Sequence, residues 1–271
     1  MRGIAGKAIV VTGASSGIGA RVAVALGARG ADLVLAARRG ERLGAVAGRV
    51  RERGGRALVV PTDVTLKKDL TGLVEAASEE YGRCDVLLNN AGIPGGGRFE
   101  DQTLAQLERI AFTNYLSVLR LTKLFLPMLL NARGHVVNVA SLAGRFAVPG
   151  AAAYTSSKHA VVAFSESLYY ELEPQGVMVT VVNPGFVETE GFPHDELKRN
   201  AGTRRLVMPP GPTVRAIVEV IEKRKGPEVS IPRWLGPLQA FRILTPPLYR
   251  AGVRRFTTHR AHEPRTHFEE S

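Results

Sequence analysis

The feature that most constrains the fold is a regular alternation of short apolar runs with longer segments of helical periodicity. The apolar runs occupy residues 7–13, 31–39, 56–64, 84–92, 134–141, 176–185 and 227–232. Segments between them, such as 17–30, 41–55 and 66–82, repeat apolar residues every three or four positions and end in glycine. Continuous apolar runs indicate strands buried on both faces, and their alternation with helices is typical of a doubly wound parallel sheet. We therefore predict an α/β fold of about seven parallel strands with helices on both faces.

The domain organisation changes after about residue 190. Residues 1–232 are predicted to form one domain, in which residues 186–208 are rich in turn formers and charge and are read as a mobile flap. Residues 233–271 form a C-terminal extension that mixes apolar and basic residues and ends in a polar tail, expected to be partly disordered. Prolines argue against one long helix there. Packing on the protein is the first interpretation of this extension, and peripheral contact with an anionic membrane is the second.

The composition, with 45% hydrophobic and 23% charged residues among 271, indicates a globular protein. Cys84 is the single cysteine, which excludes an intrachain disulfide. No signal peptide is visible, and the apolar run 121–130 is short and interrupted by Lys123, so a cytoplasmic protein is expected. The net charge of +11 would attract phosphate-bearing ligands, anionic membranes or nucleic acid. No nucleic-acid motif and no metal-ligand spacing among the six histidines are present, so neither partner is predicted.

A glycine-rich loop, "TGASSGIG" at 12–19, lies between the first strand and the first helix. Gly13, Gly17 and Gly19 would let backbone amides approach a phosphate at the helix N-terminus, although the spacing differs from GxGxxG. The next strand ends in Arg38 and Arg39 without an acid, and arginine suits a 2′-phosphate better than ribose hydroxyls. The loop and the strand end together favour a Rossmann-like dinucleotide site that prefers NADP.

A hydroxyl, a phenol and an ammonium group follow one another at a fixed spacing. Ser141 precedes Tyr154 by thirteen residues, and Lys158 follows Tyr154 by four, one helical turn. In isolation such a pair is more often an exposed helix contact. Its position downstream of a phosphate-binding loop favours a catalytic interpretation, in which the charge of Lys158 lowers the pKa of the Tyr154 phenol.

At this point the chain resembles the short-chain dehydrogenase/reductase family over roughly residues 5–232. The resemblance rests on several motifs in the family's order. These are "TGASSGIG" at 12–19, "DV" at 63–64, "NNAG" at 89–92, Asn114, Ser141, "YTSSK" at 154–158, "NPG" at 183–185 and Thr189. Any one of these motifs is weak evidence alone. Their occurrence together, in the family's order and at family-like spacing, makes a chance match very improbable.

The resemblance implies four catalytic residues. Tyr154 would be the general acid in carbonyl reduction and the general base in the reverse direction. Lys158 would hold the nicotinamide ribose, and Ser141 would bind the substrate oxygen. Asn114 would keep the long helix at 103–130 locally open and hold a water that relays protons to Lys158.

The resemblance also implies the residues that bind the cofactor. They are Gly13, Ser15, Ser16, Gly17, Ile18 and Gly19 in the loop, Arg38 and Arg39, Asp63 and Val64 at the adenine, Asn90, Ala91 and Gly92 at the adenosine ribose, Tyr154, Lys158, Pro184, Gly185, Val187 and Thr189. Ser16 stands where some NADP-selective members carry a basic residue, so the NADP prediction rests mostly on Arg38, with a contribution from Arg39.

The substrate is expected to be a carbonyl or a secondary alcohol. Apolar residues of the expected pocket favour a hydrophobic one, and they are Leu142, Ala143, Phe146, Val148, Ile93 and Pro94. Two rival classes stay open: a non-catalytic NADP-binding sensor, and a nucleic-acid binder resting on charge alone. The family commonly pairs its long helices, here 103–130 and 154–172, which implies a homodimer or homotetramer.

Overall fold

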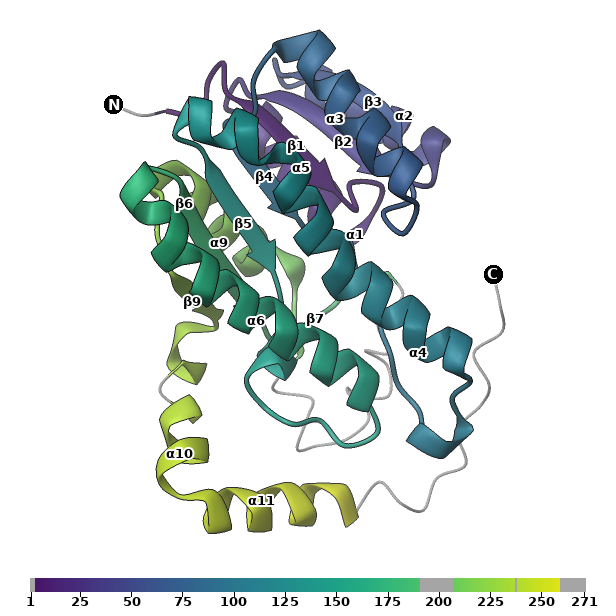
Figure 1. Cartoon of the computed structure of the whole chain (residues 1–271), viewed down its shortest axis with the longest axis vertical. Coiled ribbons are helices and arrows are strands. Elements are labelled where there is room, and N and C mark those ends of the chain that lie inside the picture. Colours follow the sequence, from purple (N-terminus) through teal and green to yellow (C-terminus); the bar gives the residue numbers. More distant parts are fainter. Residues whose placement is uncertain (1–2, 191–206, 237, 259–271) are drawn as a thin grey trace.

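The centre of the molecule is a parallel sheet of seven strands. The computed structural model describes residues 3–190, 207–236 and 238–258 (Figure 1). In spatial order the strands are β3 (Arg56–Pro61), β2 (Asp32–Ala37), β1 (Ala8–Thr12), β4 (Val86–Asn89), β5 (His135–Val139), β6 (Met178–Pro184) and β9 (Glu228–Ile231). Every neighbouring pair is parallel. The predicted doubly wound parallel sheet is confirmed.

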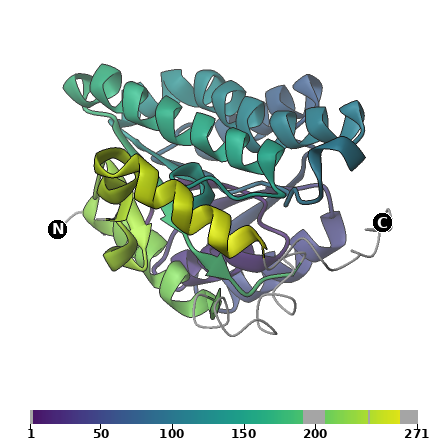
Figure 2. The ribbon, with the colours of Figure 1, turned by 90° about the horizontal axis from the view of Figure 1, so that it is seen from below.

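The sheet's strands are apolar throughout because both of their faces are covered. All five residues of β1 are buried. Successive side chains point to opposite faces, so Ile9 and Val11 join one core cluster and Val10 joins the other. The helices α1 (Gly17–Gly27), α2 (Gly40–Arg51) and α9 (Pro210–Lys223) cover the first face. The opposite face carries α3 (Lys67–Tyr81), α5 (Ser117–Ala132) and α6 (Ala152–Leu172), and the two layers are visible in Figure 2.

The long helix predicted at 103–130 is divided by one irregular turn. It begins as α4 (Leu104–Ala111), where Thr103 and Gln106 form a reciprocal capping box. A π-helical turn at Phe112–Leu116 follows, and the helix continues as α5. A π-turn widens the helix by one residue, and such turns are frequent at functional sites.

One element was not predicted. Helix α9 begins with Pro210, Gly211 and Pro212, which resemble a turn in sequence. Proline is nevertheless well tolerated in the first helical turn, where its missing N–H has no intrahelical partner. The flap predicted at 186–208 is bounded by β7 (Phe186–Val187) and β8 (Val207–Met208), which pair in parallel. Its residues 191–206 lie outside the described residues, as does the predicted tail 259–271.

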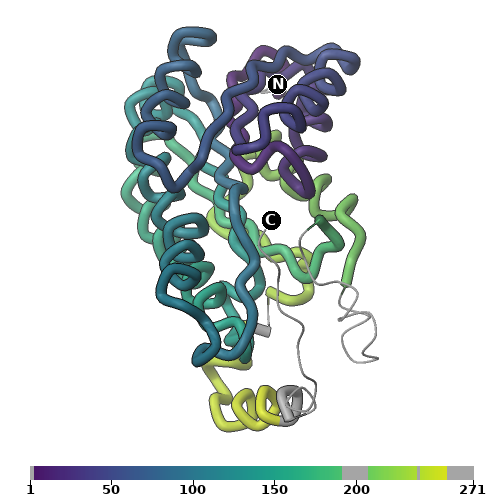
Figure 3. Tube along the Cα trace, turned by 90° about the vertical axis from the view of Figure 1, so that its right-hand side faces the viewer, coloured from purple at the N-terminus to yellow at the C-terminus, as the bar shows by residue number. Residues whose placement is uncertain are grey.

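The C-terminal extension forms two helices rather than one, as its prolines predict. They are α10 (Leu238–Leu244) and α11 (Pro246–Thr258). Both lie at one end of the long axis of the molecule (Figure 3). Within the described residues, no helix is both long enough and apolar enough to cross a bilayer.

The topology leaves an opening at the carboxyl edge of the sheet. From β1 the chain winds outward to β3, then returns to β4 on the other side of β1. The loops after β1 and β4 therefore diverge, and ligands of open α/β sheets bind at such a point. The same edge receives Ser141 after β5 and Pro184 at the end of β6.

Gly19 has no room for a side chain. A Cβ there would lie 2.4 Å from the carbonyl oxygen of Gly13 and 2.5 Å from Nδ2 of Asn90. We predict that Gly19→Ala lowers the free energy of unfolding by about 1–3 kcal/mol through overpacking. Gly44→Ala is the matched control, because a Cβ on this helical glycine meets nothing within 4 Å. It should stabilise by about 0.5–1 kcal/mol. Urea denaturation of both variants tests this, and equal effects would contradict it.

Candidate active site

The centre of the candidate site is the pair Tyr154 and Lys158, one turn apart near the start of α6. Lys158 is buried, and its Nζ donates a hydrogen bond of 3.0 Å to the carbonyl oxygen of Val139, at the end of β5. The same Nζ lies 5.8 Å from the centroid of the Tyr154 ring. Burial lowers the pKa of the Lys158 ammonium group to about 8. The helix and the end of β5 therefore hold an ammonium group beside a phenol in a poorly solvated place.

Ser141 reaches this pair from the end of β5. Its Oγ accepts a hydrogen bond of 3.1 Å from the backbone N–H of Ala143, which caps the short 3₁₀ turn Leu142–Gly144. Burial raises the pKa of Tyr154, and a hydrogen bond with the side chain of Ser141 opposes that rise. The expected lowering of this pKa by Lys158 is not seen, because the ammonium group donates to Val139 rather than to the phenol. The neutral phenol is the stable form here.

Asn114 is fully buried in the π-helical turn. Its Oδ1 accepts from the N–H of Ile93 at 2.8 Å, and its Nδ2 donates to the carbonyl of Ile93 at 3.0 Å. The amide also donates to Oγ of Ser157 at 3.2 Å, one residue before Lys158. Asn114 thus joins the loop after β4 to α6. A Cβ on Gly92 would lie 3.3 Å from Oδ1 of Asn114 and 3.5 Å from Nζ of Lys158, so both polar groups border this glycine.

The glycine loop leads into the N-terminus of α1, whose first backbone N–H groups have no partner within the helix. Ser16 is the N-cap of α1 but makes no side-chain capping bond, and the first turn of the helix carries no acid. The N-terminal amides and the helix dipole are therefore available to an anion. Gly13 and Gly17 both have positive φ, at 65° and 57°. The donor set of this loop suits a pyrophosphate, because a helix N-terminus without an acid follows glycines that have no room for side chains against residues 90 and 91.

Thr12 and Asn90 support the loop from beneath. Oγ1 of Thr12 accepts from the N–H groups of Asn90 and Ala91, both at 3.0 Å. Nδ2 of Asn90 donates to the carbonyl of Thr12 at 3.0 Å. Sequence reasoning placed Thr12 in a motif but gave it no role, although its position at the end of the first strand was a signal.

The arginines at the end of β2 differ in their contacts. Arg39 donates to Oγ of Ser16 at 2.9 Å and of Ser15 at 3.2 Å, so it lies over the glycine loop. Arg38 is exposed, and within the described part of the chain it makes no hydrogen bond or ion pair. Sequence reasoning missed a third arginine, Arg42, which donates to Oε1 of Glu190 at 2.6 Å. Glu190 also lies 3.5 Å from Arg39, and its arginine neighbours lower the pKa of its carboxyl group.

The remaining predicted cofactor residues fall into two groups. Asp63 accepts from the N–H of Thr65 at 2.9 Å, and Val64 is buried in the core, so this pair shapes the turn after β3. Gly185 donates to the carbonyl of Ile231 at 2.8 Å, directly after Pro184 at the end of β6. Val187 is buried in β7, and Oγ1 of Thr189 is 3.5 Å from its carbonyl.

Thr189 also lies next to the glycine loop. A Cβ on Gly17 would be 3.5 Å from Cβ of Thr189. The segment after β6 and the loop after β1 are thus brought together at one edge of the sheet. A dinucleotide extended along this edge could contact both.

The C-terminal extension packs on the loop between Ser141 and Tyr154. Oη of Tyr249 in α11 accepts from the N–H of Ala147 at 3.0 Å, and its ring lies 6.4 Å from that of Phe146. In α10, Arg242 donates to the carbonyl of Arg145. Packing of the extension on the protein, the first interpretation from sequence, is therefore what the structure shows. It fixes one wall of the expected substrate pocket.

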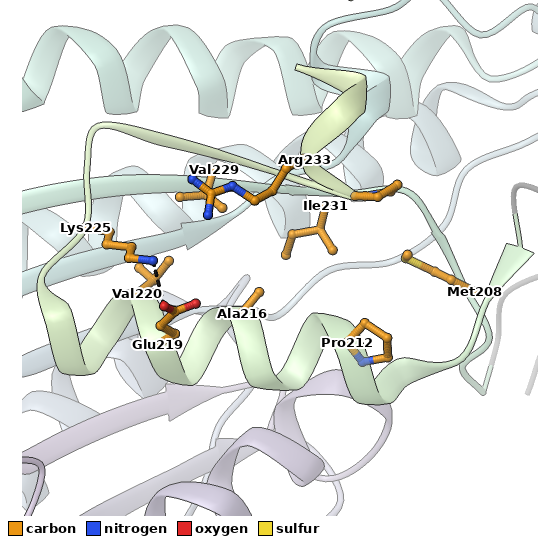
Figure 4. Close-up of a pocket in the computed structure, with 10 residues that line it drawn as sticks. Met208, Pro212, Ala216, Glu219, Val220, Lys225, Val229, Ile231 and Arg233 are labelled. Carbon is orange, nitrogen blue, oxygen red and sulfur yellow. Dashed lines mark hydrogen bonds and ion pairs between the residues drawn. The ribbon is translucent and has the colours of Figure 1, made fainter. Parts of the chain in front are cut away.

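A separate cavity lies away from these residues. It has a volume of about 230 Å³ and is bounded by α9, β9 and the turn after β9 (Figure 4). Its lining includes Met208, Ala216 and Ile231, with Glu219 and Lys225 paired at 2.7 Å at one side. Neither Ser141 nor Tyr154 lines it. Among the described residues no group of three or more His, Cys, Asp or Glu side chains could hold a metal ion.

The doubly wound fold carries a half-buried serine and tyrosine and a buried lysine at one edge of the sheet, and it is the fold of a dinucleotide-binding oxidoreductase. The chain belongs to the short-chain dehydrogenase family, whose profile, described as "short chain dehydrogenase", matches residues 7–199. It is 35% identical over 232 residues to the ketoacyl reductase HetN of Nostoc sp., covering 85% of this chain and 80% of that protein.

Two further proteins are similar to this chain. The chain is 40% identical over 185 residues to 11-beta-hydroxysteroid dehydrogenase-like 4A of Arabidopsis thaliana, covering 68% of this chain and 62% of that protein. A variant of actinorhodin polyketide ketoreductase, solved with NADPH, superposes with a TM-score of 0.73 at 30% identity. That match covers 83% of this chain and 95% of the ketoreductase.

Burial of Lys158 should cost stability. Its pKa is about 8 in the folded protein and 10.5 as a free side chain, so below pH 8 the folded state carries a poorly solvated charge. We predict that Lys158→Met raises the free energy of unfolding at pH 7 by about 2 kcal/mol, after loss of the bond to Val139. The difference from the parent protein should shrink between pH 8 and pH 10.5, where folded Lys158 becomes neutral. Denaturation at several pH values tests this, with Lys68→Met on the exposed side of α3 as control. If Lys158→Met raised the free energy of unfolding equally at every pH, the buried charge would not be the cause of the gain.

Proposed function

We propose that the protein transfers a hydride between NADP(H) and a hydrophobic carbonyl or secondary alcohol, with Tyr154 as the general acid and base. The observation that carries this proposal is the convergence of Ser141, Tyr154, Lys158 and Asn114 beside a glycine loop suited to a pyrophosphate. A sensor that only binds the dinucleotide would not need these four residues, because it transfers no proton to a substrate.

The residues divide the work in carbonyl reduction. A nicotinamide bound here would supply the hydride for the carbonyl carbon. Tyr154 would give its phenolic proton to the carbonyl oxygen. Burial raises the pKa of Tyr154, so the phenol carries that proton at neutral pH. Ser141 donates a hydrogen bond to the substrate oxygen as negative charge develops there. Lys158 would hold the ribose hydroxyls, and Asn114, which lies with Lys158 beside Gly92, would help to return the proton to Tyr154 through a water.

The NADP preference rests on the arginines at the end of β2. Ala37, Arg38 and Arg39 offer no acid to the ribose hydroxyls, and two guanidinium groups can meet a 2′-phosphate. Arg39 already lies over the hydroxyls of Ser15 and Ser16. The NADPH bound to the similar polyketide ketoreductase supports the same choice.

The substrate class follows from the walls of the expected pocket and from the relatives. Phe146 and Val148 lie on the loop after Ser141, and this loop is apolar apart from Arg145, which pairs with Glu228. The similar proteins are named for ketoacyl, polyketide and hydroxysteroid chemistry. A ketone on an apolar chain or ring system, such as a 3-oxoacyl group, fits best.

Self-association through the long helices is part of the proposal. Leu119 and Leu124 on α5 and Tyr170 on α6 are exposed apolar side chains. They would be covered in a homodimer or homotetramer that pairs these helices.

Tyr154→Phe tests the reaction. Removing the phenolic hydroxyl removes the proton donor and leaves the ring, so kcat for NADPH-dependent reduction should fall by about 10²–10⁴-fold. NADPH oxidation is followed by absorbance across apolar ketones, aldehydes, quinones and 3-oxoacyl thioesters. NADPH affinity, measured by fluorescence titration, should change little. Full turnover by the Phe variant on a substrate of the parent protein would overturn the assignment.

Replacing both Arg38 and Arg39 by alanine tests the cofactor preference. Loss of the charge-assisted bonds to a 2′-phosphate should raise KM for NADPH by about tenfold to a hundredfold and leave KM for NADH nearly unchanged. The two single variants divide the effect between the arginines. Arg21→Ala, an exposed position on α1, controls for the change in net charge. An equal rise for both cofactors would argue against 2′-phosphate recognition.

A further inference from the structure

The two C-terminal helices direct polar side chains toward the body of the protein. In α10, Gln239 donates to Oε1 of Glu228 at 3.1 Å. Arg242 donates to Nε2 of His159 at 2.8 Å as well as to the carbonyl of Arg145. Together with the bond from Ala147 to Tyr249 in α11, these hydrogen bonds connect both helices to the body of the protein.

Large apolar side chains of the same segment point away from the body. Ile243 is 75% exposed, Leu244 77% and Leu248 62%. Trp234, in the turn before α10, is 60% exposed, and Phe241 is 46% exposed. We call these five residues the outward apolar face. The described part of the chain has eleven exposed large apolar residues, and five of them lie in this short segment. Exposed apolar side chains are therefore concentrated at the two C-terminal helices. An ordinary surface helix has the opposite polarity, and an exposed apolar patch marks a binding surface.

The charge around this face selects the kind of partner. Residues 233–258 contain arginine at positions 233, 242, 250, 254 and 255 and no aspartate or glutamate. Arg233 and Arg250 are exposed. A second copy of the chain would bring two such basic segments together, within a protein of net charge +11. An anionic surface would instead be attracted.

The position of the helices allows a flat surface to reach them. Figures 1 and 3 show α10 and α11 at one extremity of the long axis, and Figure 2, seen from below, shows α11 lying across that end. Short helices with an apolar face and flanking arginines, lying parallel to a surface, are the geometry of interfacial membrane binding.

We propose that the outward apolar face, together with the exposed Arg233 and Arg250, binds the surface of an anionic lipid bilayer. The helices lie in the interface and do not span it. The carboxyl edge of the sheet points toward the same end of the molecule, so the candidate active site would open near the bilayer (Figure 1).

Vesicle binding by the full chain tests the proposal without substrate or cofactor, so the result is independent of the proposed reaction. Vesicles of phosphatidylcholine mixed with phosphatidylglycerol should retain the protein in sedimentation, and vesicles of phosphatidylcholine alone should retain far less. Trp234 is the single tryptophan and lies within the face. Its emission should shift to shorter wavelength on binding, because the indole leaves water.

Matched variants locate the surface. Ile243→Ser with Leu244→Ser should lower the partition coefficient by on the order of tenfold or more, since two buried apolar side chains are lost. Leu104→Ser on α4 is the control, because Leu104 is as exposed as Leu244, at 77%. Arg250→Gln should weaken binding to the anionic vesicles, whereas Arg21→Gln on α1 should not. Circular dichroism confirms that each variant is folded.

Three outcomes would overturn the proposal. They are no binding to anionic vesicles, an equal loss with Leu104→Ser, and concentration-dependent self-association that the Ile243 and Leu244 substitutions abolish. The last, measured by light scattering, would make the face an interface between copies of the chain.

Discussion

The hydrogen bonds between Thr12 and the backbone of residues 90 and 91 hold together the two halves of the sheet where their loops diverge. The order of the strands separates these loops, and the Thr12 hydroxyl with the Asn90 amide restores the connection. Gly13 and Gly19 are required because Asn90 lies where their side chains would be. The conformation of the glycine loop is thus a consequence of close packing between two strand ends, and its glycines serve stability as well as the proposed binding of a phosphate.

Burial acts on the two titratable groups of the site in the same sense, by favouring their neutral forms. It raises the pKa of Tyr154 and lowers that of Lys158 to about 8. The first effect keeps a proton on the group proposed to donate it. The second means that the fold tolerates an ammonium group at a cost, which a bound ribose could offset by supplying hydroxyl acceptors. Functional sites often carry such locally unfavourable features.

Local patterns in the sequence predicted the sheet because each strand is apolar in itself, and the motif residues marked its carboxyl edge. The π-helical turn at Asn114 was anticipated only through family resemblance. Helix α9 was missed because its first turn, with Pro210 and Pro212, resembles a loop. Contacts such as Arg42 with Glu190 join residues 148 positions apart, and no local pattern encodes them. The same holds for Ala147 with Tyr249, which lie 102 positions apart.

The C-terminal helices connect the loop between Ser141 and Tyr154, which is proposed to line the substrate pocket, to the outward apolar face. Tyr249 and Arg242 bind the loop between Ser141 and Tyr154, while Ile243 and Leu244 face outward from the same α10. Thermodynamic linkage makes this connection reciprocal. A ligand that binds the outward apolar face and orders α10 and α11 would, through these contacts, also stabilise the loop beside Ser141. Equally, a substrate that orders this loop strengthens binding at the outward face by the same factor. Binding of an apolar substrate would therefore raise the affinity for an apolar surface, and the reverse. The hydrogen bonds of Tyr249 and Arg242 to the loop would carry this coupling.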